Sequence, residues 1–194
     1  MKKWKVKTLA TDFQTDSKNS QSRFSRFVEP ALRAFGFSNV VSAEKQDSQL
    51  KRLLDFAGVD ALATSKDGAT MTLASRIIQK KKKPNCGDYD CFSLRNSRST
   101  GYRTEFEKLK RAIEKNSLRP MWHCQTFIDE TLNLATVGIV RTRDLVNYTA
   151  THKTKTKTTN DGANFKLVKW RDLIRAGVKV TTIKIDANGK KITA

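Results

Sequence analysis

The strongest candidate for a chemically active residue in this chain is a single carboxylate inside an apolar stretch. Asp60 stands in the run Gly58-Val59-Asp60-Ala61-Leu62, which has the pattern of a short strand. A carboxylate in such a place must be paired or metal-bound, because burying a bare charge is costly. Carboxylates that hold a divalent cation, with a basic group near the phosphate, commonly carry out phosphodiester cleavage. Asp60 is therefore a candidate metal ligand. The alternative is an edge-strand residue that faces water or caps a turn after Gly58.

Other residues combine basic side chains with aromatic rings, a mixture that can neutralise phosphates and stack on bases. Aromatic residues near positions 89–103 stand beside arginines, and two lysine-rich runs lie at 80–83 and 153–157. Solvated loops are the alternative interpretation of the lysine runs. The candidate nucleic-acid-binding residues are Lys80, Lys81, Lys82, Lys83, Arg95, Arg98, Tyr102, Arg103, Lys153, Lys155 and Lys157.

The charge of the whole chain supports an anionic partner. Its 194 residues contain 38 Lys and Arg against 19 Asp and Glu, a formal net charge of +19 at pH 7. Such a surplus repels itself in a compact fold and is usually neutralised by a partner. A membrane surface would require a basic amphipathic helix with an apolar stripe, whereas the basic residues here are scattered. Nucleic acid is the leading expectation, and an acidic protein is the alternative.

The cysteines and histidines suggest a zinc site only weakly. Cys86, Cys91, His123 and Cys124 could supply four ligands, but their spacing is only loosely finger-like. Adjacent residues of a strand point to opposite faces, so His123 and Cys124 are not expected to converge. Three cysteines do not indicate a disulfide framework and suit a reducing compartment. The sequence has no glycine-rich nucleotide loop, and its histidines give little support for a nucleophilic triad.

The elements of the first half can be predicted from periodicity and turn residues. Apolar residues at spacings of three and four predict a helix from Ser20 to Gly36, with a kink near Val28 caused by Pro30. A short strand at 39–43 and a helix at 50–57 follow. Strands at 59–64 and 70–78 flank the turn signal Lys66-Asp67-Gly68, which predicts a hairpin.

The second half predicts further strands and helices. We expect a loop at 80–91, a strand at 92–95 and a helix at 104–116 that begins with a Thr104/Glu107 capping box. Strands at 121–128 and 135–140, a helix at 141–150, a Lys/Thr-rich loop at 151–162, a strand at 165–168, a helix at 169–176 and a hairpin at 178–193 complete the chain. The fold class is α/β (α+β), with a central mixed β-sheet flanked by helices. One domain at 20–194 follows a basic strand or loop extension at 1–19.

Several short motifs resemble phage-encoded proteins of the PD-(D/E)XK, or restriction-endonuclease-like, nuclease superfamily. They are the run from Leu54 to Leu62, the Asp67-Gly68 turn, the strand end Ala74-Ser75-Arg76-Ile77-Ile78-Gln79, the segment 92–95 and the segment 101–108. The resemblance covers roughly residues 24–130. It implies a mixed sheet flanked by helices, with an Asp at the start of one strand and a Glu/Gln-X-Lys motif on the next.

The resemblance also implies site residues. Asp60 matches the strand aspartate, and Glu29 matches an acidic residue of the first helix, so both would hold Mg²⁺ or Mn²⁺. The second-strand motif departs from the pattern, because Ala74 cannot bind a cation and Arg76 cannot act as a base. Arg76 would contact the scissile phosphate. Gln79, Glu105 or Asp55 could replace the missing ligand, with Gln79 included among the catalytic candidates.

Three functions follow from these expectations. The first is a metal-dependent nuclease that acts on DNA, including branched or structured DNA. The second is a catalytically inactive nucleic-acid-binding protein on the same fold, and the third is a basic protein that binds an acidic host protein. We expect no membrane association, since no run of about 18 apolar residues occurs. We expect a cytoplasmic location, in the host cell if the protein is phage-encoded. The resemblance also implies that the protein could form a homodimer.

Overall fold

The computed structural model describes residues 19–80, 90–97, 104–159 and 162–192. The N-terminal extension at 1–18 lies outside these ranges, as do most of the loop predicted at 80–91 and the segment 98–103. The helical elements are η1 (Phe24–Val28), α2 (Glu29–Phe35), η2 (Ala43–Lys45), α3 (Ser48–Ala57), α4 (Glu105–Glu114), α5 (Thr142–Thr151) and α6 (Trp170–Arg175). The strands are β1 (Ser38–Ser42), β2 (Ala61–Thr64), β3 (Thr70–Gln79), β4 (Cys91–Ser97), β5 (Trp122–Ile128), β6 (Leu134–Arg141), β7 (Lys155–Thr158), β8 (Asn164–Lys169), β9 (Val180–Asp186) and β10 (Lys191–Ile192).

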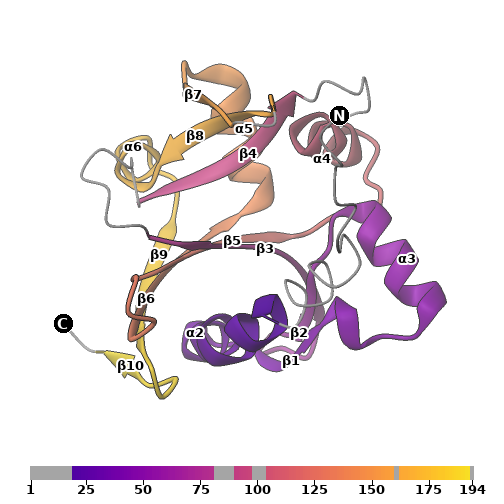
Figure 1. Cartoon of the computed structure of the whole chain (residues 1–194). Helices are drawn as coiled ribbons and strands as arrows, with labels where there is room; N and C mark the ends of the chain where they lie inside the picture. The colour runs from indigo at the N-terminus through magenta and orange to yellow at the C-terminus, as the bar shows by residue number, and fades with distance from the viewer. Residues whose placement is uncertain (1–18, 81–89, 98–103, 160–161, 193–194) are drawn as a thin grey trace, which may run out of the picture.

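A curled mixed sheet of seven strands, in the order β1-β2-β3-β5-β6-β9-β10, forms the centre of the fold (Figure 1). The neighbours β3 and β5 are parallel, with Leu73 opposite Trp122, and the other neighbouring pairs are antiparallel. A helix, α4, lies in the crossover between β3 and β5. The predicted mixed sheet with flanking helices is therefore present.

Apolar side chains form a core on each side of this sheet. One core joins η1 and α2 to the sheet through Phe27, Leu32 and Ile139. The other joins the sheet to β4, β8 and the helices α4, α5 and α6, with Phe92, Leu145 and Trp170 fully or almost fully buried. Figure 1 shows α2 on one face of the sheet and the second group of elements on the opposite face. Each strand at the centre is thus covered on both faces.

The first helix is interrupted where the sequence predicts it. Residues 24–28 form a π-helical segment, in which the Glu29 backbone N–H donates to the Phe24 carbonyl. Pro30 occupies the first turn of α2, where its missing N–H costs little. The five-residue π spacing accommodates the proline without ending the helical axis. The helix ends at Gly36, whose φ of 113° suits a residue without Cβ.

One predicted loop is a strand. Residues 151–162 were expected to form a Lys/Thr-rich loop, but Lys155–Thr158 forms β7, which pairs with β8. Alternation of lysine with β-branched threonine has the two-residue period of a strand, and lysine is common on exposed edges. The predicted strand at 92–95 belongs with β7 and β8 to a separate three-stranded sheet, β4-β8-β7. The hairpins around Gly68 and Gly189 and the Thr104/Glu107 capping box are confirmed.

Within the described ranges, no helix combines the length and the apolar character needed to cross a membrane.

Candidate functional site

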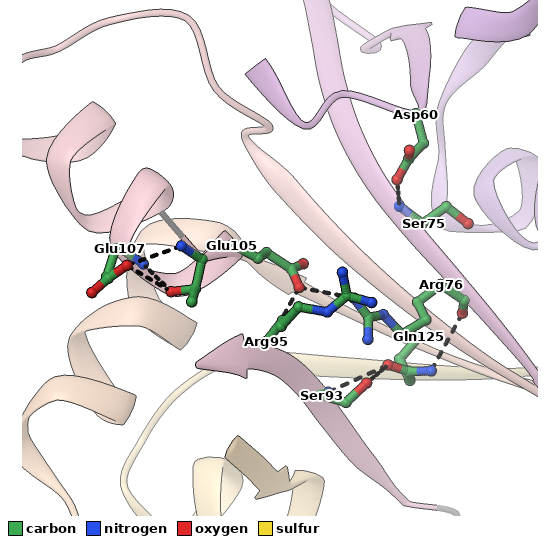
Figure 2. A network of polar contacts seen from close by, with 9 residues as sticks. Asp60, Ser75, Arg76, Ser93, Arg95, Glu105, Glu107 and Gln125 are labelled. Carbon is green, nitrogen blue, oxygen red and sulfur yellow. Dashed lines mark hydrogen bonds and ion pairs between the residues drawn. The ribbon is translucent and has the colours of Figure 1, made fainter. Parts of the chain in front are cut away.

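Asp60 lies where β2 leaves the side of β3. Strand β2 pairs with β3 only as far as Leu73, so the next backbone groups on that edge of β3 have no strand beside them. The Asp60 carboxylate takes the place of a strand there, because its Oδ2 accepts the Ser75 backbone N–H at 2.7 Å (Figure 2). Backbone bonds to Leu73 and Ala43 hold Asp60 on both sides. Asp60 therefore has a structural role as an edge cap, and its Oδ1 stays available.

The surroundings of Asp60 favour its protonated form. Desolvation of the carboxylate by the surrounding protein raises the pKa of Asp60 from 3.8 to about 6, and the hydrogen bond from the Ser75 N–H opposes this rise. Repulsion from Glu105 and Asp55 adds to the rise, whereas Arg76 lowers it. Water still reaches the residue, which is exposed at the surface. A carboxylate with a perturbed pKa in a hollow is a candidate functional group.

Arg76 and Arg95 are organised around Glu105, the first residue of α4. Glu105 Oε2 accepts from the Arg76 guanidinium at 2.8 Å and from the Arg95 backbone N–H at 3.1 Å (Figure 2). The Thr104/Glu107 capping box fixes the first turn of α4 and with it Glu105. Both guanidinium groups also lie over the ring of Phe165 on β8, at 4.9 and 5.2 Å. Arg76 is consequently held in one orientation by a carboxylate and an aromatic ring.

A buried side-chain amide, that of Gln125, connects the strands that carry Arg76 and Arg95. Gln125 on β5 is fully buried, and its Oε1 accepts from the Ser93 hydroxyl at 2.9 Å. Its Nε2 donates to the Arg76 carbonyl at 3.4 Å. Gln125 thus links β4 of the small sheet to β3 of the large sheet directly beneath Arg76.

Two hollows meet at Asp60. The first, which we call the acidic hollow, has a volume of about 360 Å³ and includes Glu44, Asp55 and Asp60 in its lining. The second, which we call the arginine hollow, has a volume of about 330 Å³. Asp55, Asp60 and Ser75 line both. The charged side chains that line the arginine hollow are Asp55, Asp60, Arg76, Arg95, Glu105 and Lys108.

The structure brings some of the predicted site residues together and not others. Asp60, Arg76 and Arg95 share the arginine hollow. Glu29 lines neither hollow and instead pairs with Arg33 one turn along α2, at 2.9 Å. Gln79 lies at the far end of β3, where it accepts from Arg23 at 3.0 Å. The carboxylates that join Asp60 in lining the hollows are Glu44, Asp55 and Glu105.

The predicted nucleic-acid-binding residues fall into three groups. Lys81, Lys82, Lys83, Arg98, Tyr102 and Arg103 lie outside the described residues, and Lys80 follows β3, where its backbone N–H donates to Ile128. Lys153 is exposed before β7. In the small sheet, Phe165 on β8 lies between Arg95 on β4 and Lys157 on β7, each of which is its direct neighbour across the strands. Lys155 lies two residues before Lys157 and therefore on the same face. We call Arg76, Arg95, Lys155 and Lys157 the basic strip.

Two charged residues that line the hollows, Lys108 and Glu44, were not among the predictions. Lys108 stands three residues after Glu105 on α4, and this spacing places both on one face of the helix. That signal was present in the sequence. Glu44 lies in the short helix η2, and nothing in its local sequence relates it to Asp60. Only the pairing of β1 with β2 brings the two residues to one hollow.

Among the described residues, the weakly suggested zinc ligands lie on both sides of the large sheet. Cys124 lies in the core beside η1 and α2, whereas the His123 ring packs edge-on against Phe92 in the opposite core, at 5.9 Å. The two residues face opposite sides, as predicted from the strand period. Cys91 is buried in the second core, and Cys86 lies outside the described residues. In the described ranges, no group of three or more His, Cys, Asp or Glu is arranged to hold a metal.

His123 predicts a pH dependence of stability. It is 1% exposed, its ring nitrogens have no protein partner, and burial lowers its pKa from 6.5 to about 4. The unfolded chain therefore binds a proton that the folded chain does not bind between these values, and stability falls as pH drops from 6.5 to 4. The full effect is about 3 kcal/mol. Urea unfolding of wild type and His123→Leu should show a difference that grows toward low pH in favour of the variant. Equal pH profiles would contradict this assignment.

Comparison of the chain with models of protein families, with curated proteins and with solved structures finds no match, so the site is defined by its own geometry.

Proposed function

We propose that this chain is a metal-dependent nuclease that binds nucleic acid, with DNA as the expected partner, and that the phosphate to be cut lies in the arginine hollow. The observation that carries the proposal is the meeting of Asp60 and Asp55 with Arg76 and Lys108 in one hollow. Three acidic and three basic side chains line it. A phosphate alone would be repelled by the carboxylates, whereas a divalent cation together with a phosphate would be attracted by both sets of charges.

The residues present suit Mg²⁺ or Mn²⁺ only if the substrate completes the site. Magnesium is usually held by one or two carboxylates together with substrate phosphates and water. Asp60 Oδ1 and Asp55 are the donors that would hold it, since Glu105 is engaged by Arg76 and Arg95 and Ala74 offers no donor. When bound, such an ion polarises the phosphate and lowers the pKa of a coordinated water.

The side chains of the arginine hollow would position the substrate. Glu105 and Phe165 hold Arg76, and its remaining guanidinium N–H groups can donate to a phosphate oxygen. Lys108 adds a second positive charge from α4, with its amine over the Phe56 ring at 5.8 Å. Because Glu105 and Phe165 hold Arg76 before binding, its guanidinium can stabilise developing charge without rearrangement.

The basic strip extends from this hollow along one face of the small sheet. A nucleic-acid backbone that entered the arginine hollow could follow Arg95, Lys157 and Lys155 across β4, β8 and β7. This course accounts for part of the +19 charge by placing it beside the candidate site.

The strip gives a measurable salt dependence. Each phosphate contact contributes a slope of about −0.9 to a plot of log affinity against log salt concentration for duplex DNA. Lys157→Ala should therefore weaken binding and make the slope shallower by about 0.9. Lys184→Ala on β9 is a matched control, because Lys184 is also exposed on a strand but lies in the large sheet away from the strip. Equal slopes for the two variants would place the DNA elsewhere, and a flat slope for the wild type would exclude nucleic acid binding.

A catalytically inactive nucleic-acid-binding protein is the second candidate, and the Ala74 position favours it. Ala74 lies where the resemblance expects a metal-binding side chain, and it is 5% exposed. Incubation of the intact chain with duplex, single-stranded and branched DNA, with Mg²⁺ or Mn²⁺, separates the two. Cleavage supports the nuclease. Binding without cleavage of any substrate supports the second candidate, and RNA in the same assays tests the choice of DNA.

The restriction-endonuclease-like fold is part of this proposal. Its support is the mixed sheet flanked by helices, the position of Asp60 directly before β2, and the placement of Ala74, Ser75 and Arg76 on the neighbouring β3. A homodimer and a location in the host-cell cytoplasm remain expectations of the resemblance.

A further inference from the structure

A third hollow, separate from the Asp60 site, has features of a binding site for a flat aromatic ligand. Its volume is about 620 Å³, within the range of about 300–1,000 Å³ common for small-ligand sites. It lies between α5, the first residue of β5, the last residue of β6 and the segment that joins α6 to β9. It shares no lining residue with the acidic hollow or the arginine hollow.

Helix α5 has two faces, one that packs in the core and one that lines this hollow. Its apolar face is buried in the core through Leu145 and Val146. Its next face carries residues at helical spacings of three, four and seven that line the hollow, namely Asp144, Asn147, Tyr148 and Thr151. Tyr148 also packs partly against the second core, whereas core packing does not account for the polar residues Asp144, Asn147 and Thr151.

Aromatic rings lie on two sides of the hollow. Tyr148 and His152 stack face to face, with ring centroids 4.1 Å apart and planes within 6°. Trp122 is braced by the edge contact of Phe35, at 5.1 Å and 70°. The Arg141 guanidinium lies over Trp122, at 5.6 Å. His152 covers one face of Tyr148 and Arg141 covers one face of Trp122, so a flat ligand would extend these existing stacks, which are already ordered before it binds.

Polar groups in the same lining suit the edges and the phosphate of a nucleotide. The Asn147 amide can donate and accept together, the pattern that pairs with an adenine edge, and Asp144 can accept from an amino group. Arg141 and Lys179 bring positive charge to the hollow for a phosphate. An aliphatic ligand would use neither these polar groups nor the ring faces.

We propose that this hollow binds an unstacked nucleobase, with the Tyr148–His152 stack and Trp122 as the aromatic surfaces and Asn147 as the group that contacts the base edge. The inference rests on the proposed function when the base belongs to a nucleic-acid strand. A free nucleotide has the same chemistry and is the other source. A base bound here would hold a single-stranded or frayed segment at a second point, away from the arginine hollow.

The fluorescent adenine analogue 2-aminopurine tests this site directly. It is used as the free mononucleotide and within a single-stranded oligonucleotide, with fluorescence quenching as the measure of stacking on the protein. Tyr148→Ala should weaken binding about tenfold, equivalent to about 1.4 kcal/mol. Tyr148→Phe keeps the ring and should bind as the wild type does. Leu118→Ala changes an exposed apolar residue outside the hollow and serves as the control.

The outcomes separate this inference from the nuclease proposal. Tyr148-dependent quenching of both probes supports a base site used by nucleic acid, and quenching of the mononucleotide alone assigns it to a free nucleotide. No Tyr148-dependent quenching of either probe overturns the inference, even where DNA binding is strong and salt-dependent. If cleavage and salt dependence are absent while Tyr148-dependent quenching persists, the proposed function fails and the base site stands.

Discussion

Asp60→Asn is expected to lower metal-dependent cleavage at least a hundredfold while making the protein more stable at pH 8. The loss of activity follows because an amide is a poor ligand for Mg²⁺, and a loss of about 2.7 kcal/mol of transition-state stabilisation corresponds to a hundredfold in rate. Asparagine keeps an oxygen that can accept the Ser75 N–H, so the edge of β3 stays capped. The lost activity therefore reports the charge of Asp60 and not an unfolded edge.

The gain in stability follows from the sign of the pKa shift. The pKa of Asp60 rises from 3.8 to about 6 in the fold. Between these values the folded chain binds a proton that the unfolded chain does not, so stability falls as pH rises, and the penalty is complete above 6. Because Asp60 is exposed to solvent, we expect a penalty of only about 1 kcal/mol. Asp60→Asn removes it at pH 8 and changes little at pH 3.5.

Cleavage rates and urea unfolding of the same preparations measure both effects. Glu114→Gln removes a carboxylate from the exposed last turn of α4 and should change neither quantity. Wild-type cleavage should also decline at low pH, and more Mg²⁺ should move the decline to lower pH, since a proton and the cation compete for Asp60. A variant that cuts as well as the wild type would remove Asp60 from the reaction. A variant that is less stable at pH 8 would contradict the assigned cost of its charge.

The position of Asp60 beside β3 could be predicted from the sequence because the signal was local, and its role as a metal ligand stays a prediction. A carboxylate in an apolar run beside a predicted hairpin required no knowledge of distant contacts, and the hairpin fixed the register that places Asp60, one residue before β2, beside Ser75. Glu105 was one of three possible substitutes for the missing ligand. Its engagement by Arg76 and Arg95 depends on the meeting of β3, β4 and α4, which are separated along the chain. Local patterns do not determine such a meeting.

The small sheet shows the same limit for the fold. Lysine and threonine alternate in 153–158, and the composition suggests a solvated loop as readily as an edge strand. The neighbouring strand β8 decides between a loop and a strand, because its edge opposite β4 is open for pairing with β7. Glu29 shows the converse case. It lies on the predicted helix, but its side chain pairs with Arg33, and Ser20, Gln21 and Phe24 are the residues of that segment that line the acidic hollow.

Gly138→Ala is expected to lower the free energy of unfolding by about 3 kcal/mol, because the added methyl group overpacks the core. Gly138 lies in the middle of β6, where glycine weakens a strand, so propensity alone would predict that alanine stabilises it. The structure reverses that sign. A Cβ at Gly138 would lie 2.4 Å from two carbons of the Trp170 ring.

Trp170 cannot retreat easily, since it is 6% exposed and packs against Phe92 and Phe127, with ring centroids 5.9 Å away in each case. A double-mutant cycle with Trp170→Leu isolates the clash, because leucine removes the ring that the methyl group meets. Gly138→Ala should cost much less in the Trp170→Leu background than in the wild type, as measured by urea unfolding. Equal costs in both backgrounds would show that the methyl group does not meet the ring, and a stabilising effect in the wild type would mean that strand propensity outweighs packing at this position.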